Sequence, residues 1–548
     1  MVHIVSHFFL FFFLIYFNGK IFLENFKLNN LNLDIFQISI FGLIFTGLFA
    51  QIINIFIPLN FFLLILNLII INTYLIYNYK KFFFRIKKID YIYFILFLLI
   101  TLNIYGSDFS DDLNNYHYGF ILNSDSGNFI VGMSHLYQMY AFSPIWLTTH
   151  SYFNFDYSRL QDIHVLNGLI FFIFLSIFYK EIKDSFDKKR INILIPVTFF
   201  ILVFVLIKYT RLKEFGIDRP SFLIIFFFIF FILKNFFSNL KENQVDSKII
   251  LMIYLSMFLF YSKIIFFFTA LIPIYYIIRY KKLKIFFSKN FLPIYLIILG
   301  YFIKNLIISG CLIFPISLTC LNFLSWSAKE YAEYQMIFTE IINKSWTIYN
   351  GQLTNIEYIR DFNWIETWFN RHKIEFFEFF LTSGLATILT LFSFKSLKEK
   401  KSNFYFLKNS ELITIFSLLF VIQLIFFISK NPVIRMSHYL FVFFYSMIII
   451  FIFRNFKLHL KKRVISAIFI FAISFNAFKN FTRISENNFI NDPHQMVKPY
   501  IDKQTKEKLG DFEYYNGWYG NFPAGKVILG SSFDHKKKFI FDIIYKVN

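Results

Sequence analysis

Residues 251–278, LMIYLSMFLFYSKIIFFFTALIPIYYII, form a long apolar run. Whether this run forms one membrane-spanning helix or two decides on which side of the membrane the later loops lie. A hydrocarbon core of ~30 Å needs only about 20 helical residues, so this run is longer than one span requires. Lys263 lies near its middle, where a charge inside hydrocarbon is costly, but at the tip of a short hairpin it would reach water. We therefore predict that the run breaks at Ser262 and Lys263 into two helices.

Apolar runs recur along the chain, which is 57% hydrophobic, above the about 45–50% of soluble domains, with a mean hydropathy of +0.55. The first run has no small-residue exit site of a signal peptide and is expected to remain as a helix. The sequence predicts an all-α polytopic membrane protein with about 12–14 transmembrane helices in residues 1–480 and extracytoplasmic loops that carry short helices. The fourteen candidate spans are 4–18, 38–57, 60–78, 90–105, 163–179, 191–207, 221–237, 248–261, 263–279, 291–309, 374–394, 411–429, 436–453 and 464–480.

The formal net charge of +21 would suggest nucleic acid as the partner of a soluble protein, but here the basic residues cluster in short loops and set topology. If residues 251–278 are split, all of these clusters fall on one side, which we expect to be cytoplasmic. We therefore expect membrane lipids, and no nucleic acid, as partners. The clusters are 80–88, 187–190, 279–284, 395–401 and 457–463, and the opposite side then holds 106–162, 208–220, 310–373 and the small C-terminal segment 481–548.

Residues 106–162, GSDFSDDLNNYHYGFILNSDSGNFIVGMSHLYQMYAFSPIWLTTHSYFNFDYSRLQD, invert the charge of the chain, with six aspartates against one basic residue, Arg159. One reading is a solvated loop in which Asp and Asn make turns. The other is a site in which a partly desolvated carboxylate deprotonates an acceptor hydroxyl or amine. The aspartates are Asp108, Asp111, Asp112, Asp125, Asp156 and Asp162.

Asp111 and Asp112 are adjacent, so on an extended turn they would face opposite sides, and only one would meet a membrane-proximal cavity. Asp112 is our preferred base, with Asp111 as the other candidate. Tyr116 and His117 would orient the substrate or the base. The alternative for His117 is a loop histidine that only makes hydrogen bonds to neighbouring groups. The two carboxylates could hold Mg²⁺ or Mn²⁺, but the sequence requires no divalent cation, and no metal site is predicted.

Basic residues from separate segments are expected on the same extracytoplasmic face, against the usual positive-inside bias. A phosphate or pyrophosphate would explain them, because guanidinium forks match phosphate oxygens. Lipid head groups, or salt bridges to Glu214 and Asp218, are the alternatives. The five candidates for phosphate or substrate binding are Lys208, Arg211, Lys263, Lys304 and Arg435.

Cys311 and Cys320 both lie at the start of the loop 310–373. In an oxidising compartment a disulfide between them would close a short loop directly after the helix that ends near residue 309. The alternative is that both cysteines are buried free thiols. The tail 481–548 is rich in aromatic and turn-forming residues. We expect a small extracytoplasmic cap, or a surface that stacks aromatic rings on sugars.

SDDLNNYHYG at 110–119, an acidic pair after a helix followed by a Tyr-His element, resembles the first large loop of the GT-C superfamily of membrane glycosyltransferases. IKNLIISGCLIFPISLT, with Lys304, Asn305, Gly310 and Pro315, is similar to a helix-exit pattern in bacterial members. The resemblance implies a polyprenyl-phosphate-linked sugar donor, an envelope glycan, lipid or protein acceptor, a loop aspartate as base and basic residues on the donor phosphate. It also implies a bacterial inner membrane protein whose active site faces the periplasm.

Two other functions remain open. An O-antigen-type polymerase or ligase would use a late loop with Arg and His, here Arg360, Arg371 and His372. A lipid-linked glycan transporter would carry charges at mid-helix and repeat symmetry, which the sequence lacks. The early Asp pair favours the glycosyltransferase.

Overall fold

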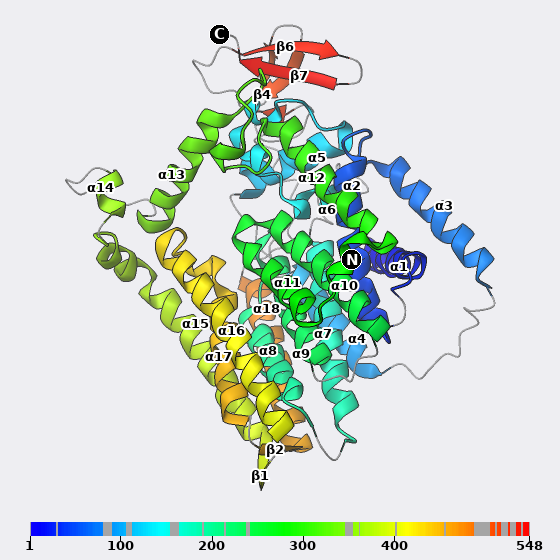
Figure 1. Cartoon of the computed structure of the whole chain (residues 1–548), viewed down its shortest axis with the longest axis vertical. Helices are drawn as coiled ribbons and strands as arrows, with labels where there is room; N and C mark the ends of the chain where they lie inside the picture. Colours follow the sequence, from blue (N-terminus) through cyan, green and yellow to red (C-terminus); the bar gives the residue numbers. More distant parts are fainter. Residues whose placement is uncertain are drawn as a thin grey trace.

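The computed structural model describes residues 2–28, 31–79, 90–105, 112–153, 164–188, 191–212, 215–236, 242–345, 355–360, 362–400, 403–453, 456–486, 505–509, 512–516, 524–525, 533–538 and 541–546. Long helices fill most of this part of the chain (Figure 1). They are α1 (Val2–Asn25), α2 (Ile35–Ile53), α3 (Phe61–Tyr77), α4 (Tyr91–Tyr105), α7 (Val165–Ser185), α8 (Leu194–Lys208), α9 (Asp218–Phe236), α10 (Glu242–Ser262), α11 (Leu271–Arg279), α12 (Leu292–Ser309), α15 (Ile365–Ser393), α16 (Asn403–Ser429), α17 (His438–Phe453) and α18 (Lys462–Glu486).

Each of the fourteen predicted spans falls on one of these helices. Among the described residues, eight helices are long and apolar enough to cross a membrane, and five apolar helical stretches are shorter. The protein is therefore an all-α polytopic membrane protein, as predicted. Several helices begin earlier than predicted: α9 begins at Asp218 and α15 at Ile365, so the second large loop ends before residue 373.

The apolar run 251–278 divides where its lysine predicts. Helix α10 ends at Ser262, and Lys263 has an extended backbone with φ −153° and ψ 131°. A 3₁₀ helix, η6 (Ile264–Ala270), then leads into α11. The Ser256 hydroxyl lies 3.0 Å from the Thr269 carbonyl oxygen and ties the two arms of the hairpin together.

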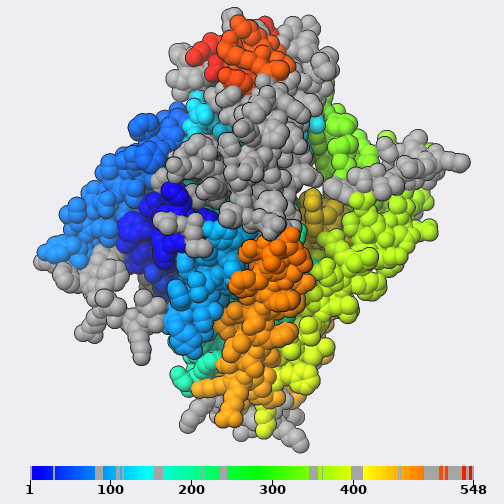
Figure 2. Space-filling model, turned by 180° about the vertical axis from the view of Figure 1, so that it is seen from behind, coloured from blue at the N-terminus to red at the C-terminus, as the bar shows by residue number. Residues whose placement is uncertain are grey.

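The two ends of the molecule carry different sets of strands (Figure 1). At one end, strand β1 (Phe394–Lys400) pairs antiparallel with β2 (Phe456–Leu460), and Ile191 forms a bridge with Leu458. Three of the predicted cytoplasmic clusters, 187–190, 395–401 and 457–463, adjoin or overlap these strands. The C-terminal strands lie at the opposite end, and Figure 2 shows them there from behind, with α18 in orange on the surface below.

Short helices occupy both large loops at this opposite end. The tail forms a sheet in the order β3-β4-β5 and an antiparallel hairpin of β6 and β7. The hairpin joins the first loop, because the Val131 amide donates to the Asp542 carbonyl oxygen at 2.9 Å and the Ile544 amide to that of Val131 at 2.9 Å. The short helices are η2 (Leu113–His117), α5 (Tyr118–Ser126), η3 (Met133–His135), η4 (Gln138–Phe142), α6 (Ile145–Tyr152), η9 (Ser317–Thr319), α13 (Lys329–Ser345) and α14 (Asn355–Ile359), and the strands are β3 (Thr505–Leu509), β4 (Phe512–Asn516), β5 (Ala524–Gly525), β6 (Phe533–Lys538) and β7 (Phe541–Lys546).

Candidate functional site

Asp112 caps a π-helical turn, which replaces the extended turn expected at this point. Its backbone is helical, with φ −66° and ψ −28°, and the Tyr118 amide donates to the Leu113 carbonyl oxygen in the wide turn η2. Residues four positions apart are neighbours on such a turn, and the charge of Asp112 acts on Tyr116. The helical geometry therefore places Asp112 near Tyr116, which itself packs against His117. Asp111 lies outside the described residues.

His117 is buried, with an exposed fraction of 3%, and within the described part of the chain neither of its ring nitrogens has a hydrogen-bond partner. Burial lowers the pKa of this histidine to about 3, so the ring is neutral at physiological pH. The Tyr116 ring packs against it with centroids 4.4 Å apart. Burial, together with the charges of Asp112 and Asp218, raises the pKa of Tyr116 well above 10.0, which keeps its hydroxyl protonated.

Asp218 brings a second carboxylate to the same place from the first turn of α9. It forms an ion pair with Lys263, the residue at the hairpin tip. Both charges act on the His117 ring, so the hairpin tip and the π-helical turn lie close to each other. The predicted candidate Lys263 is thus close to the π-helical turn, and its ion-pair partner is Asp218.

Arg435 completes this group from η10 (Ile434–Met436), just before α17. Its charge acts on both Tyr116 and Asp218. Helix α15 holds this segment, because the Trp368 indole donates to the Pro432 carbonyl oxygen at 2.5 Å. We refer to these six residues as the Asp112 cluster: Asp112, Tyr116, His117, Asp218, Lys263 and Arg435.

A second group of polar residues begins one position further along α9, at Arg219. The Arg219 guanidinium lies 5.9 Å from the centre of the Tyr209 ring, and the Tyr209 hydroxyl lies 3.2 Å from Nδ1 of His438. The predicted candidates Lys208 and Arg211 belong here. Lys208 pairs with Glu378 at 2.5 Å, and the charge of Arg211 acts on Arg219.

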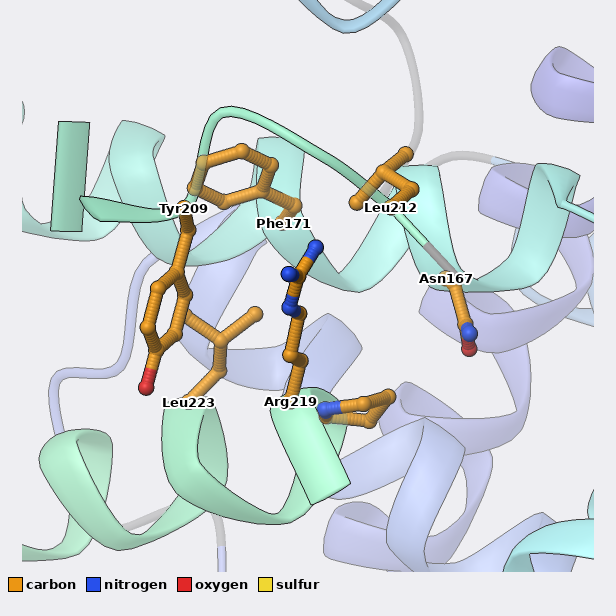
Figure 3. Close-up of a pocket in the computed structure, with 7 residues that line it drawn as sticks. Asn167, Phe171, Tyr209, Leu212, Arg219 and Leu223 are labelled. Carbon is orange, nitrogen blue, oxygen red and sulfur yellow. The ribbon is translucent and has the colours of Figure 1, made fainter. Parts of the chain in front are cut away.

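Figure 3 shows a pocket in this second group, with Arg219 between Tyr209 and Asn167. The pocket is small and has mostly apolar walls. We call it the Arg219 pocket, and it is lined by Asn167, Phe171, Tyr209, Leu212, Arg219, Pro220 and Leu223.

Lys304 contacts a different part of the first loop. Its ammonium is fully buried and donates to the Ser143 carbonyl oxygen at 2.8 Å, so it ties α12 to that loop. Cys311 and Cys320 form a disulfide with a sulfur–sulfur distance of 2.02 Å, which closes the start of the second loop. The helix-exit motif therefore supports the local fold.

Sequence reasoning missed Asp218 and His438 as site residues. Asp218 had been considered only as a salt-bridge partner for nearby cations, and Lys263 is such a partner. The signal that could have found it is DRP immediately before an apolar run, which places an acid at a helix start. Among the described residues, no group of three or more His, Cys, Asp or Glu side chains is arranged to hold a metal ion.

Comparison with known families gives one match, over residues 1–445, to a family described as Domain of unknown function (DUF8201). Comparison with curated proteins and with solved structures finds no match. The family match covers most of the 548 residues, including every member of the Asp112 cluster. The chain therefore belongs to the DUF8201 family.

Proposed function

We propose that this protein is a membrane glycosyltransferase of the GT-C type. It would move a sugar from a polyprenyl-phosphate-linked donor to a cell-envelope acceptor, which is a glycan, a lipid or a protein. The observation that carries the proposal is the Asp112 cluster: a half-buried carboxylate at the start of a π-helical turn acts on Tyr116, which packs against a neutral histidine, and Lys263 and Arg435 act on the same group of residues. π-helical turns occur frequently at functional sites.

The chemistry needs one base and one anion-stabilising group. The Asp112 carboxylate takes the proton of the acceptor hydroxyl or amine. At the same time the acceptor oxygen or nitrogen forms a bond to the anomeric carbon of the sugar. The bond from the anomeric carbon to the phosphate oxygen breaks, and its electron pair leaves with the polyprenyl phosphate. Lys263 and Arg435 would stabilise the departing anion, since positioning and charge stabilisation supply most of the rate in such a transfer.

His117 and Tyr116 position these groups in this scheme. A neutral imidazole with unpartnered nitrogens can accept or donate one hydrogen bond to a sugar hydroxyl without adding charge. Tyr116, which stays protonated, can donate to a carboxylate or sugar oxygen. Both would bind substrate, and neither would change its net charge during transfer.

The location that fits this reaction is a bacterial inner membrane, with the Asp112 cluster facing the periplasm. Two observations support this orientation. Three of the five predicted cytoplasmic basic clusters adjoin or overlap β1 and β2 at one end, and the disulfide between Cys311 and Cys320 lies in a loop assigned to the other side. Disulfides persist in oxidising compartments such as the periplasm.

The test is transfer in proteoliposomes that contain the purified protein. A panel of radiolabelled polyprenyl-phosphate sugars is offered with lipid, glycan and peptide acceptors, and label is expected to pass from one donor to one acceptor. A polyprenyl-diphosphate oligosaccharide serves as the control donor. Chain extension from this control, with no transfer from any monophosphate donor, would contradict the proposal and indicate a polymerase or ligase.

A further inference from the structure

The Arg219 pocket contains a guanidinium group of which one nitrogen, Nη1, makes no hydrogen bond to the described part of the protein. Nη1 of Arg219 is buried, and within the described part of the chain it has no hydrogen-bond partner. Leaving a buried donor of a charged group unpaired costs more than an ordinary lost hydrogen bond. An acceptor atom in the pocket would remove that cost.

Positive charge is concentrated around the same point. Arg211 and Arg483 both lie close enough for their charges to act on the Arg219 guanidinium. Arg483 is held against the segment after α8, where it donates to the Thr210 backbone oxygen and, at 2.9 Å, to the Thr210 hydroxyl. Of these three guanidinium groups only that of Arg219 lines the pocket, and the Asp218 carboxylate also acts on it, but positive charge still exceeds negative charge around Arg219, which favours an anion there.

The walls limit what can enter. About 10 Å³ is free for the centre of a water-sized sphere, which is room for one water molecule or one oxygen atom of a larger group. The Tyr209 ring lies on one side of Arg219 and Asn167 on the other (Figure 3). The Asn167 amide is already engaged, because its Oδ1 accepts from the Trp146 indole at 3.0 Å, so Arg219 is the group that can receive a ligand.

We propose that the Arg219 pocket is a phosphate-binding site that admits one phosphate oxygen to Nη1 of Arg219, from either free phosphate or a lipid head group. A guanidinium matches phosphate oxygens better than an ammonium does, and the apolar walls strengthen the charge-assisted hydrogen bond. The site is distinct from Lys263 and Arg435, and it does not rest on the proposed transfer reaction.

The experiment measures binding and needs no turnover. The melting temperature of the purified full chain in neutral detergent is followed during titration with inorganic phosphate, with dioctanoyl phosphatidylglycerol, and with dioctanoylglycerol, which has the same tails but no phosphate. Wild type is compared with Arg219→Gln. The matched control is Arg279→Gln at the far end of α11, where Arg279 pairs with Glu411.

We expect a saturable rise in melting temperature with a phosphate-bearing probe and none with dioctanoylglycerol. Arg219→Gln should weaken the apparent affinity about tenfold or more, and Arg279→Gln should leave it unchanged. A response to both phosphate probes assigns the site to phosphate in general, and a response to the lipid alone assigns it to a membrane-borne phosphate. Equal binding by wild type and Arg219→Gln, or no binding of either phosphate probe, would overturn the proposal.

Discussion

Asp218, the first residue of α9, forms an ion pair with Lys263, the residue at which the apolar run 251–278 breaks. The two side chains are 31% and 21% exposed, so the pair is partly withdrawn from water. The charges of both residues also act on His117. Lys263, the residue at which the apolar run breaks into two helices, is therefore also a member of the candidate site.

The ion pair should appear as an energetic coupling between these two positions. Asp218→Asn and Lys263→Met should each lower the melting temperature, because each leaves a partly buried charge without its partner. The double variant should lose less stability than the sum of the two single changes. We expect a coupling energy of about 1–2 kcal/mol in a double-mutant cycle of thermal unfolding in detergent. Strictly additive losses would show that the two charges do not interact.

His117 should make the protein less stable in mild acid. Burial lowers its pKa from 6.5 to about 3, so between these values the unfolded chain binds a proton that the folded chain does not. Stability is then full above pH 6.5 and falls as the pH drops toward 3, by at most about 1.4 kcal/mol per pH unit for this group. His117→Gln should flatten the fall in melting temperature between pH 7 and 5. His150, whose pKa burial also lowers to about 3, remains in both proteins and contributes equally. An unchanged pH profile in His117→Gln would refute this assignment.

The crossing of α1 and α2 should not tolerate a side chain at Gly42. A Cβ atom there would lie 1.8 Å from the Ile15 carbonyl oxygen and 2.8 Å from the Gly19 nitrogen, both of which are backbone atoms. Gly42→Ala should therefore force the helices apart and cost at least about 1–3 kcal/mol of folding stability. Gly384→Ala is the control, since its Cβ would meet only the end of the Tyr445 side chain, 3.3 Å from the hydroxyl oxygen and 3.9 Å from Cζ. Equal melting temperatures for the two variants would show that the helices do not cross in this way.

The fold was predictable because membrane spans depend on long apolar runs and on the positions of lysine and arginine, which single sequences display. Lys263 alone identified the break in residues 251–278. Helix starts were less predictable: polar residues such as Asp218 and Glu366 extend α9 and α15 beyond their apolar parts.

The candidate site was only partly predictable, because it is assembled from segments far apart in sequence. The acidic loop identified Asp112, Tyr116 and His117, but the π-helical turn that joins them has no clear sequence signal. Basic residues that the sequence assigned to the same role have different partners in the structure. Lys263 lies in the Asp112 cluster, whereas Lys304 donates to a backbone oxygen elsewhere.

The central claim is that Asp112 is the base of a sugar transfer, and the most direct test compares Asp112→Asn with wild type in proteoliposomes that contain a polyprenyl-phosphate sugar. We predict that Asp112→Asn binds the donor as wild type does but transfers at least about 100-fold more slowly. The matched control is Asp125→Asn, a half-buried aspartate of the same loop, which should transfer at nearly the wild-type rate. Transfer by Asp112→Asn at the wild-type rate would contradict the account.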